Sequence, residues 1–458
     1  MKHFLYSMPY GISFRNIVCC GVVEACTSRG AAATLLIPTL TESDAKQIAT
    51  EVPARVTVRE LLPARHSATF TCLKLFKQHL YARRTGTESF RVKHARRRRE
   101  RPFVHAGATV LERFSELLLS EAWVDAQLMR ARQPFERHYE RLLDELGVDV
   151  IVLSKPGYSP EDLALIKAAR SRHIPTISID TTWDNIVSKR PTYLAPDALT
   201  AWSDRMRDEA IKFYGLSPQH VPVTGGAPFD VFFVPEQLPS RTMFLQSLGL
   251  DPSKKLIVFT LNSPIFNLQN PLFIKFLLES VRNGAIHGDP NVVIRMHPFD
   301  RDSDHTEVVR GYGRVHLERP FGIPDGASTY ECIPSREGVR HYGALITHAD
   351  VLVNIGSTTS LDAIAADTPV VNISFDIEDI VYEFSAARFY DYSHYKPILE
   401  SRAVRLVHDP ESFFCAMNAY LSDRTLDRDL RAKACREFLT YSDGRSADRI
   451  AAAITTLC

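Results

Sequence analysis

Several features that would place a chain in a special class are missing from this sequence. No Cys-x-x-Cys pair occurs among its eight scattered cysteines, which indicates the reduced thiols of a cytoplasmic protein rather than a zinc site or a disulfide framework. No run of about eighteen apolar residues occurs, so no segment is predicted to cross a membrane. With 55 basic and 54 acidic residues, the net charge of +1 gives no general attraction to nucleic acid.

The length and the periodicity of the chain predict two α/β domains. A chain of 458 residues is too long for one ordinary core. An apolar run at 17–23 ends at Glu24, so we interpret the opening as strand, loop and helix rather than as a signal peptide. Predicted strands then alternate with helices, as in parallel sheets covered on both faces. The first series of strands is predicted at 3–7, 34–38, 148–153, 176–179, 198–202 and 221–224, and the second, after a break at 228–239, at 255–261, 291–296, 349–354, 370–374 and 402–407.

We therefore predict an α/β protein of two Rossmann-like domains that face each other across a cleft. The N-terminal domain would span 1–235, with a helical, basic insertion at about 64–145. The C-terminal domain would span 236–430, and residues 431–458 would form a helix that packs back toward the N-terminal domain. Ligands of open α/β sheets bind outside the carboxyl ends of the strands, so the predicted site lies in the cleft.

The most informative stretch follows the predicted strand at 349–354. There the sequence passes into a helix through a glycine and four hydroxyl residues, Gly356, Ser357, Thr358, Thr359 and Ser360. A glycine lets the backbone approach a ligand closely, and the free N–H groups at a helix start favour an anion. The stretch thus predicts a phosphate site. The alternative is an ordinary helix cap, for which Ser and Thr are also preferred, although one cap does not need four of them.

Two other predicted strands of the second series also end in polar residues. His297 and Pro298 follow the strand at 291–296, and Arg295 precedes the histidine by two residues. Arginine and histidine can both pair with a phosphate. The strand at 255–261 is followed by another polar exit, made by Asn262 and Ser263.

These motifs resemble the donor domain of GT-B-fold glycosyltransferases, above all bacterial surface-polysaccharide enzymes and the related CDP-glycerol and CMP-sugar transferases. The likeness covers roughly 148–450, whereas 40–147 resembles no family that we can name. The residues that carry it are Arg295–Pro298, Asp350–Asp362, Thr368–Pro369, His394–Ile398 and Asp443–Ile450, with Thr182–Asn185, Ala201–Ser203 and Val223–Asp230 in the first half.

The resemblance implies roles for several of these residues. His297 with Ser357, Thr358 and Thr359 would hold the nucleotide phosphates of a donor bound in the second domain. Asp362 stands where many GT-B enzymes carry a Glu that binds ribose or sugar hydroxyls, and its shorter side chain weakens that expectation. Such enzymes generally use no metal, so the positive groups and the helix start would stabilise the leaving phosphate. We expect no cofactor, because the nucleotide-sugar is itself a substrate.

An inverting transfer would also need a general base beside the acceptor hydroxyl, and we expect this base in the first domain. Asp180 and Asp184 flank Trp183 near the end of a predicted strand, and Asp184 is the preferred candidate. The plainer alternative is that Asp180 caps the next turn while Asp184 pairs with Lys189 or Arg190. On the same acceptor side, Arg15 and Asn16 follow the first strand, unless Asn16 only starts the first helix.

The function predicted in this way is glycosyl transfer to a growing surface polysaccharide, such as a capsule or lipopolysaccharide, or to a lipid-linked glycan. A CMP- or CDP-linked donor is favoured over a UDP-sugar. One alternative is a CDP-glycerol-type phosphotransferase, although His173 is poorly placed as its second histidine. Another is the non-hydrolysing UDP-GlcNAc 2-epimerase, which would be expected to carry paired Gly and Glu residues after Asn354. A third is a nucleotide-sugar-binding protein without catalysis.

Two charged segments invite further interpretations. The basic run Arg96–Arg99 could attract an anionic membrane surface, at about 1 kcal/mol for each residue, which would place the protein at the inner face of a membrane. A solvated surface is the plainer alternative, and nucleic acid is not expected because no aromatic residues interleave with the arginines. Asp300, Asp302 and Asp304 alternate as in an Asp-x-Asp motif, but we expect no metal there.

Overall fold

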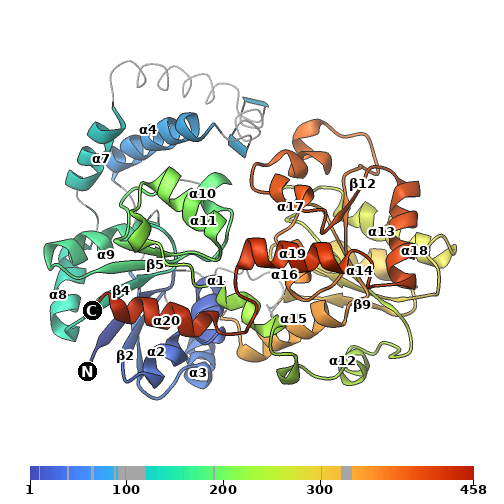
Figure 1. Cartoon of the computed structure of the whole chain (residues 1–458), viewed down its shortest axis with the longest axis horizontal. Coiled ribbons are helices and arrows are strands. Elements are labelled where there is room, and N and C mark those ends of the chain that lie inside the picture. Colours follow the sequence, from blue (N-terminus) through green and yellow to red (C-terminus); the bar gives the residue numbers. More distant parts are fainter. Residues whose placement is uncertain are drawn as a thin grey trace. The chain divides into compact units, whose positions relative to one another are not determined.

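The chain folds into two compact units in the computed structural model. Met1–Ala227 and Arg445–Cys458 form the first, and Pro228–Gly444 form the second (Figure 1). The predicted boundary after residue 235 lies inside the second unit, and only the last part of 431–458 belongs to the first. The structure describes residues 1–9, 11–38, 41–62, 67–86, 89–90, 98–99, 120–131, 133, 135–157, 159–188, 191–300, 302–320 and 333–458.

The first unit is built on a six-stranded parallel sheet in the order β3-β2-β1-β4-β5-β6. Its strands are β1 His3–Ser7, β2 Ala32–Ile37, β3 Val56–Glu60, β4 Val150–Leu153, β5 Thr176–Ile179 and β6 Ala198–Thr200. Its helices of four residues or more are α1 Gly11–Phe14, η1 Arg15–Cys19, α2 Val22–Ser28, α3 Glu42–Glu51, α4 Ala68–Thr85, α7 Glu121–Arg130, α8 Glu136–Leu146, α9 Pro160–Ser171, α10 Asn185–Ser188, α11 Asp204–Glu209, η2 Ala210–Tyr214 and α20 Ser446–Thr456.

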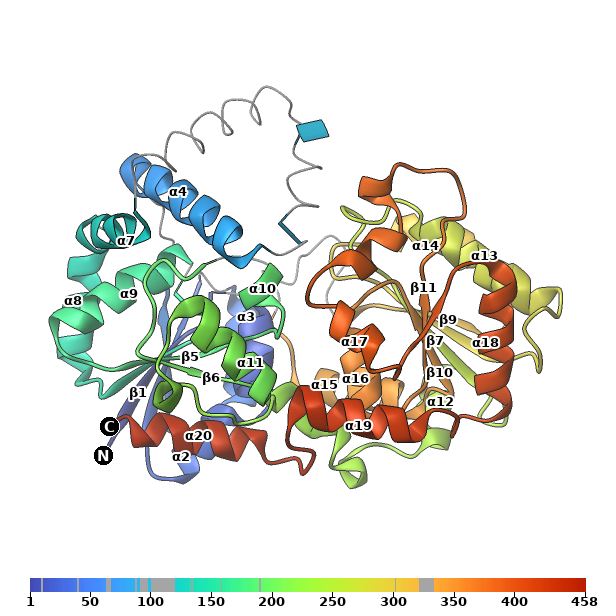
Figure 2. The same cartoon turned by 45° about the horizontal axis from the view of Figure 1, so that its top comes forward.

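The second unit repeats this plan with the order β12-β11-β10-β7-β8-β9 (Figure 2). Its strands are β7 Leu256–Thr260, β8 Asn291–Arg295, β9 Val315–Glu318, β10 Val351–Asn354, β11 Val370–Ile373 and β12 Arg405–Val407. Its helices of four residues or more are η4 Ala227–Phe232, α12 Arg241–Ser247, α13 Asn270–Arg282, α14 Asp302–Val309, α15 Arg336–His348, α16 Thr359–Ala365, η8 Ala387–Asp391, α17 Lys396–Glu400, α18 Pro410–Ser422 and α19 Arg428–Leu439.

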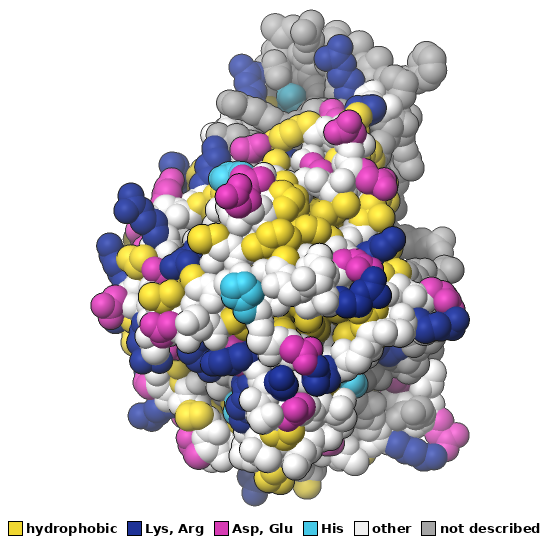
Figure 3. All heavy atoms as spheres, turned by 90° about the vertical axis from the view of Figure 1, so that its right-hand side faces the viewer, with side chains coloured by type: hydrophobic (Ala, Val, Ile, Leu, Met, Phe, Trp, Pro, Cys, Tyr) yellow, Lys and Arg dark blue, Asp and Glu magenta, His cyan; other side chains and the backbone are white. Residues whose placement is uncertain are grey.

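The apolar runs of the sequence became the buried centres of both sheets. Every residue of β4, β7 and β10 is buried, as expected for parallel strands covered on both faces. Helices α13 and α18 pack on one face of the second sheet, and α15 and α16 contact the other. Their surface is partly apolar as well: Figure 3 shows hydrophobic side chains gathered among charged ones on the face of this unit that carries α13 and α18.

Edge strands are where prediction and structure differ. The structure adds β3 and β9, which we did not predict because both are only partly buried and lack a continuous apolar run. The predicted strand at 221–224 is reduced to a single bridge between Ala201 and Val223. Within the predicted insertion at 64–145, the described residues form α4, α7 and most of α8. Among the described residues, no helix is both long and apolar enough to span a membrane.

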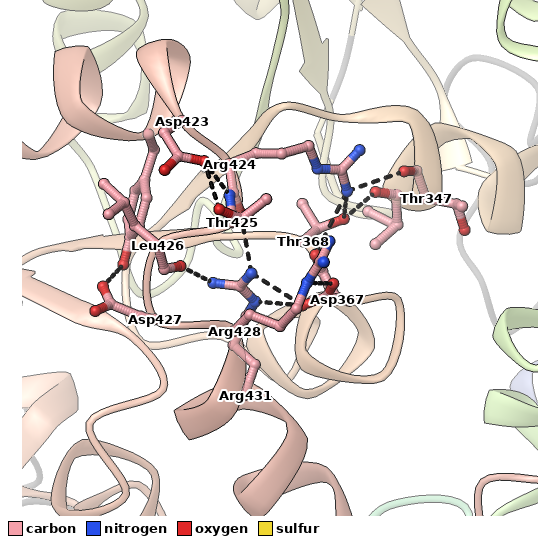
Figure 4. A network of polar contacts seen from close by, with 12 residues as sticks. Thr347, Asp367, Thr368, Asp423, Arg424, Thr425, Leu426, Asp427, Arg428 and Arg431 are labelled. Carbon is pink, nitrogen blue, oxygen red and sulfur yellow. Dashed lines mark hydrogen bonds and ion pairs between the residues drawn. The ribbon is translucent and has the colours of Figure 1, made fainter.

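A buried arginine anchors α19 to the turn between α16 and β11 (Figure 4). Arg431 is fully buried and lies 2.9 Å from Asp367, and it also donates to the backbone oxygens of Leu426 and Arg424. Arg428 reaches the same carboxylate at 2.7 Å from a more exposed position. Asp367 therefore compensates the charge that α19 carries into the interior.

Candidate functional site

The strand order of the second sheet defines where a ligand would be expected. β7 and β10 are neighbours, and the chain runs from β7 toward β8 and β9 but from β10 toward β11 and β12. Ligands of doubly wound sheets bind at this switch point, outside the carboxyl ends of the strands. The loops that begin at Leu261, Met296 and Ile355 leave the sheet at this edge, so the residues predicted from three separate motifs follow three neighbouring strands.

Two hydrogen bonds tie the β7 and β10 exits together. The side chain of Asn262 donates to the backbone oxygen of Ile355 at 2.6 Å, and the hydroxyls of Thr260 and Thr359 lie 2.9 Å apart. Asn270 of α13 in turn donates to the backbone oxygen of Asn262 at 2.7 Å. Asn262 is thus a bridge within the protein, to which its side-chain nitrogen and its backbone oxygen each contribute one hydrogen bond.

Ser263, the next residue, is different. Its side chain is only 8% exposed, and its hydroxyl has no hydrogen-bond partner among the described residues. Nearly all buried polar groups in folded proteins are hydrogen-bonded, so such an exception needs an explanation. An oxygen of a ligand or a water molecule at the switch point would satisfy it.

Gly356 is required here by packing rather than by close approach of a ligand. Its φ of +52° is left-handed, and a Cβ atom at this position would lie 2.5 Å from Cβ of Phe389. The side of the glycine that we expected to face a ligand is therefore filled by an aromatic residue. Its N–H donates to the hydroxyl of Tyr390 at 3.1 Å, so this donor is also used within the protein.

The four hydroxyl residues divide into two pairs. Ser360 is fully buried and Thr359 is hydrogen-bonded to Asn354, so both serve the interior. Ser357 is partly exposed and Thr358 is exposed. The backbone N–H groups of Ser357 and Thr359 donate to neighbouring side chains at 3.4 and 3.3 Å, beyond the usual length of such bonds. Because α16 has only seven residues, the predicted anion site at a helix start is reduced to these hydroxyls and weakly bonded amides.

His297 offers a neutral imidazole at the β8 exit. Burial lowers its pKa to about 4, although Asp300 opposes this shift. Its Nδ1 accepts the N–H of Phe299 at 3.1 Å, so the proton of the neutral ring lies on Nε2. Its backbone N–H donates to Asp300 at 2.6 Å, which fixes the loop. The histidine can thus donate one hydrogen bond to a ligand but supplies no positive charge near pH 7.

The side chain of Arg295, for which we predicted a phosphate contact, is engaged within the protein, and its phosphate role stays a prediction. This side chain is buried in an ion pair with Glu318, and its guanidinium lies 4.4 Å from the ring centre of Tyr342. Burial alone would raise the pKa of Glu318, but Arg295 and His341 hold it below its ordinary value. The charge of Arg295 is therefore already compensated. Asp362 is likewise engaged, since it accepts the hydroxyl of Tyr342 at 2.6 Å.

A second arginine, which we did not predict, lies between the exit loops. Arg388 is 1% exposed, donates to the backbone oxygen of Phe266 at 2.5 Å and lies 4.6 Å from the ring centre of Phe389. Phe266 follows β7, and Phe389 packs against Gly356. This guanidinium thus brings positive charge to the switch point. No motif or spacing in the sequence marks it.

In the first unit, the predicted acceptor-side residues gather in two small networks. Asn16 donates to the backbone oxygen of Thr181 at 3.1 Å, and Arg15 donates to Asn16 at 2.8 Å. Because Asn16 lies inside η1, it does not start the first helix. Asp180 is buried and accepts from Asn185.

Asp184 is only half-buried and accepts from Thr182 and Ser188. Trp183, between the two aspartates, is nearly buried. Lys189 and Arg190, the alternative partners of Asp184, lie outside the described residues.

A buried acid in the same unit is marked by no motif of the sequence. Asp162 of α9 is fully buried; its Oδ1 accepts the hydroxyl of Ser7 at 2.8 Å, and its Oδ2 has no hydrogen-bond partner among the described residues. Burial raises its pKa to about 7, although hydrogen bonds from Ser159 and Ser7 oppose this shift. The carboxyl group is therefore protonated over much of the pH range in which free aspartate is ionised.

Among the residues that the structure describes, no three His, Cys, Asp or Glu side chains are placed to hold a metal ion. In the Asp-x-Asp pattern, Asp300 points inward, to the backbone of His297 and to within 3.3 Å of His305. The side chains of Asp302 and Asp304 lie outside the described set.

Comparison with known proteins agrees with this architecture. No protein-family model and no curated protein sequence matches the chain. Among solved structures, it resembles the UDP-GlcNAc 2-epimerase of Neisseria meningitidis bound to UDP-GlcNAc, with a TM-score of 0.56, 12% identity and all of both chains covered. The epimerase of Methanocaldococcus jannaschii, in complex with UDP-GlcNAc and UDP, gives 0.54 at 12% identity, again over the whole of both chains. The wall teichoic acid polymerase TagF gives 0.53 at 9% identity, over all of this chain and 88% of the other.

At these identities the likeness establishes the fold. The chain is an α/β protein of the GT-B type, made of two Rossmann-like domains, as the sequence predicted. The more specific predicted relation to CDP-glycerol and CMP-sugar transferases is not established by these likenesses.

Proposed function

We propose that the second unit binds the nucleotide part of a nucleotide-activated sugar at its switch point. The observation that carries this proposal is the buried Ser263 hydroxyl, which has no hydrogen-bond partner among the described residues and lies where the chain directions of a GT-B domain diverge. A ligand oxygen would remove the free-energy cost of that buried group. Water could do the same, so ligand binding has to be tested.

The donors for the ligand phosphates would come from three exit loops. Ser263 follows β7, Nε2 of His297 follows β8, and the hydroxyls of Ser357 and Thr358 follow β10. The long hydrogen bonds of the Ser357 and Thr359 amides could be exchanged for shorter ones to phosphate oxygens. Arg388 would add positive potential. No step of this recognition needs a metal ion or a separate cofactor.

The similar solved structures favour a UDP-sugar as the substrate, in place of the cytidine-linked donor that we predicted from the sequence. Two of the similar structures are 2-epimerases that hold UDP-GlcNAc, which supports epimerisation at carbon 2 of the sugar as the leading candidate reaction. The residues Ser357–Ser360 favour the second candidate, glycosyl transfer, because they stand where we expected an epimerase to carry Gly and Glu. The similarity to the TagF polymerase also supports a transferase.

If the reaction is a transfer, Asp184 is the proposed general base. It is less buried than Asp180, and its hydrogen bonds from Thr182 and Ser188 orient the carboxylate. Arg15, Asn16 and Trp183 remain proposed acceptor-side residues, and the acceptor would be a glycan or a lipid-linked glycan. Asp184→Asn is expected to abolish turnover while nucleotide affinity stays within about twofold of wild type. An equal loss of affinity would contradict the role of a base.

Membrane association also remains a proposal. Of the basic run Arg96–Arg99, Arg96 and Arg97 lie outside the described residues. Sedimentation with vesicles of anionic and of zwitterionic lipid tests it. Replacement of all four arginines by glutamine should abolish binding to anionic vesicles. Sedimentation with zwitterionic vesicles should be the same for this variant and for wild type. Absence of wild-type binding to anionic vesicles would exclude this partner.

The test of the proposed function is a thermal-shift series with UDP-GlcNAc, UDP, CMP, CDP, GDP and dTDP. At a hundredfold excess over Kd, a ligand of the native state adds about 2.7 kcal/mol of stability. We expect shifts with UDP and UDP-GlcNAc that are reduced in Ser263→Ala and His297→Ala. Chromatography of the incubated UDP-GlcNAc then separates the candidates, since an epimerase forms the C2 epimer without acceptor, whereas a transferase needs one. Selective shifts with CMP or CDP would restore the cytidine donor, and no shift from folded protein would refute the proposal.

A further inference from the structure

Behind the exit loop of β10 lies a buried polar network that the proposed binding site does not itself include. Its members are Asn354 of β10, Asn372 of β11, Ser360 of α16 and the two tyrosines Tyr390 and Tyr395, all of them buried. A buried polar network lowers the stability of the fold unless every member forms its hydrogen bonds. The arrangement of these five side chains therefore calls for an explanation.

Tyr395 closes the inner part of the network. Its hydroxyl donates to Oδ1 of Asn372 at 2.8 Å and lies 2.7 Å from the hydroxyl of Ser360. Asn372 donates to Oδ1 of Asn354 at 2.7 Å, and Asn354 donates to Ser360 at 3.0 Å. The four side chains form a closed ring that fixes the first turn of α16 against two strands.

Tyr390 holds the glycine of the same loop. Its hydroxyl accepts the N–H of Gly356 at 3.1 Å and donates to the backbone oxygen of Ile373 at 2.8 Å. The rings of Tyr390 and Tyr395 meet edge to face, with centroids 5.4 Å apart. The two tyrosines therefore hold both ends of 356–360 in place from behind.

We propose that Tyr390 and Tyr395 are positioning residues for nucleotide binding. Neither touches the ligand, because their hydroxyls are used inside the protein and their rings are buried. They set the direction in which the Ser357 and Thr358 hydroxyls and the weakly bonded amides point. Phosphate affinity depends on this geometry, since donors held in place in advance cost less entropy on binding. This inference rests on the proposed function, because it assumes that the loop contacts the phosphates.

The test compares three variants that each remove one buried tyrosine hydroxyl, Tyr390→Phe, Tyr395→Phe and Tyr420→Phe. Tyr420 of α18 is the matched control, since it is fully buried in the same unit and donates to Asp427 at 2.7 Å but has no bond to 356–360. Titration calorimetry with UDP gives the Kd, and scanning calorimetry gives the Tm. Amide hydrogen exchange of the peptide covering 356–361 reports the geometry of the loop without any ligand.

All three variants should lose a similar amount of Tm. Tyr390→Phe and Tyr395→Phe should bind UDP about tenfold more weakly, because the loosened loop has to be ordered again on binding, and should exchange the amides of 356–361 faster. Tyr420→Phe should match wild type in both affinity and exchange. Wild-type affinity in the two loop variants, or an equal loss in Tyr420→Phe, would overturn the inference.

Failure of the proposed function would look different. In that case wild-type protein binds none of the nucleotides, and the Kd comparison has no value to report. Hydrogen exchange still decides the positioning claim, because unchanged exchange in Tyr390→Phe and Tyr395→Phe would show that these hydroxyls do not hold the loop.

Discussion

The buried carboxyl group of Asp162 makes the stability of the first unit depend on pH in a predictable direction. Its pKa is about 7 in the folded protein, against 3.8 for an exposed aspartate. Between these values the unfolded chain has released a proton that the folded protein still holds, so the free energy of unfolding falls as pH rises. The difference between the two pKa values corresponds to about 4 kcal/mol of stability above pH 7 and to about 2 kcal/mol at pH 5.

Asp162→Asn should remove this penalty. The amide has nearly the same shape, and its oxygen can still accept the hydroxyl of Ser7, which now donates to Oδ1 at 2.8 Å. Relative to wild type, the variant should therefore gain more stability at pH 8 than at pH 5, by about 2–3 kcal/mol. One amide N–H without a partner reduces the gain at both pH values alike, so the difference between them is the decisive quantity.

Urea denaturation followed by tryptophan fluorescence measures this unit selectively. All three tryptophans of the chain, Trp123, Trp183 and Trp202, lie in the first unit. Asp208→Asn on the exposed surface of α11 is the control and should change stability by less than about 0.5 kcal/mol at either pH. Equal effects of Asp162→Asn at pH 5 and pH 8, or a loss of stability that grows with pH, would show that the Asp162 carboxyl group does not stay protonated in the folded protein.

Three other variants test the second unit by scanning calorimetry. Gly356→Ala should cost about 1–3 kcal/mol more than Gly249→Ala, because both have positive φ but only the first lacks room for a Cβ atom; equal costs would contradict this. Asp367→Asn should cost about 3 kcal/mol by leaving the buried Arg431 without its carboxylate, and a cost below about 1 kcal/mol would show that the pair is unimportant. His297 has a pKa of about 4 when folded, so wild-type stability should rise with pH between 4 and 6.5 by about 3 kcal/mol, and His297→Gln should abolish this rise; an unchanged slope would mean that the imidazole is not buried in solution.

The sequence located the edge of the sheet at which the site lies, because an apolar run followed by polar residues marks the carboxyl end of a buried strand. The exits at Asn262, His297 and Gly356 were found in this way. What these side chains do could not be read from the same signal. Arg295 is compensated by Glu318, and no local pattern links two residues of separate strands. The hydrogen bonds of the buried tyrosines, too, exist only once β10 and β11 are paired.

We propose that the buried hydroxyl of Ser263, which has no hydrogen-bond partner in the part of the chain that the structure describes, marks a nucleotide site. Titration calorimetry of wild type, Ser263→Ala and Ser280→Ala with UDP tests it most directly. Ser280 is buried in α13, where its hydroxyl is bonded to the backbone of Phe276. We expect one UDP site per chain in wild type and in Ser280→Ala, and about tenfold weaker binding in Ser263→Ala. Binding that Ser263→Ala leaves intact, or no binding by folded wild-type protein, would contradict it.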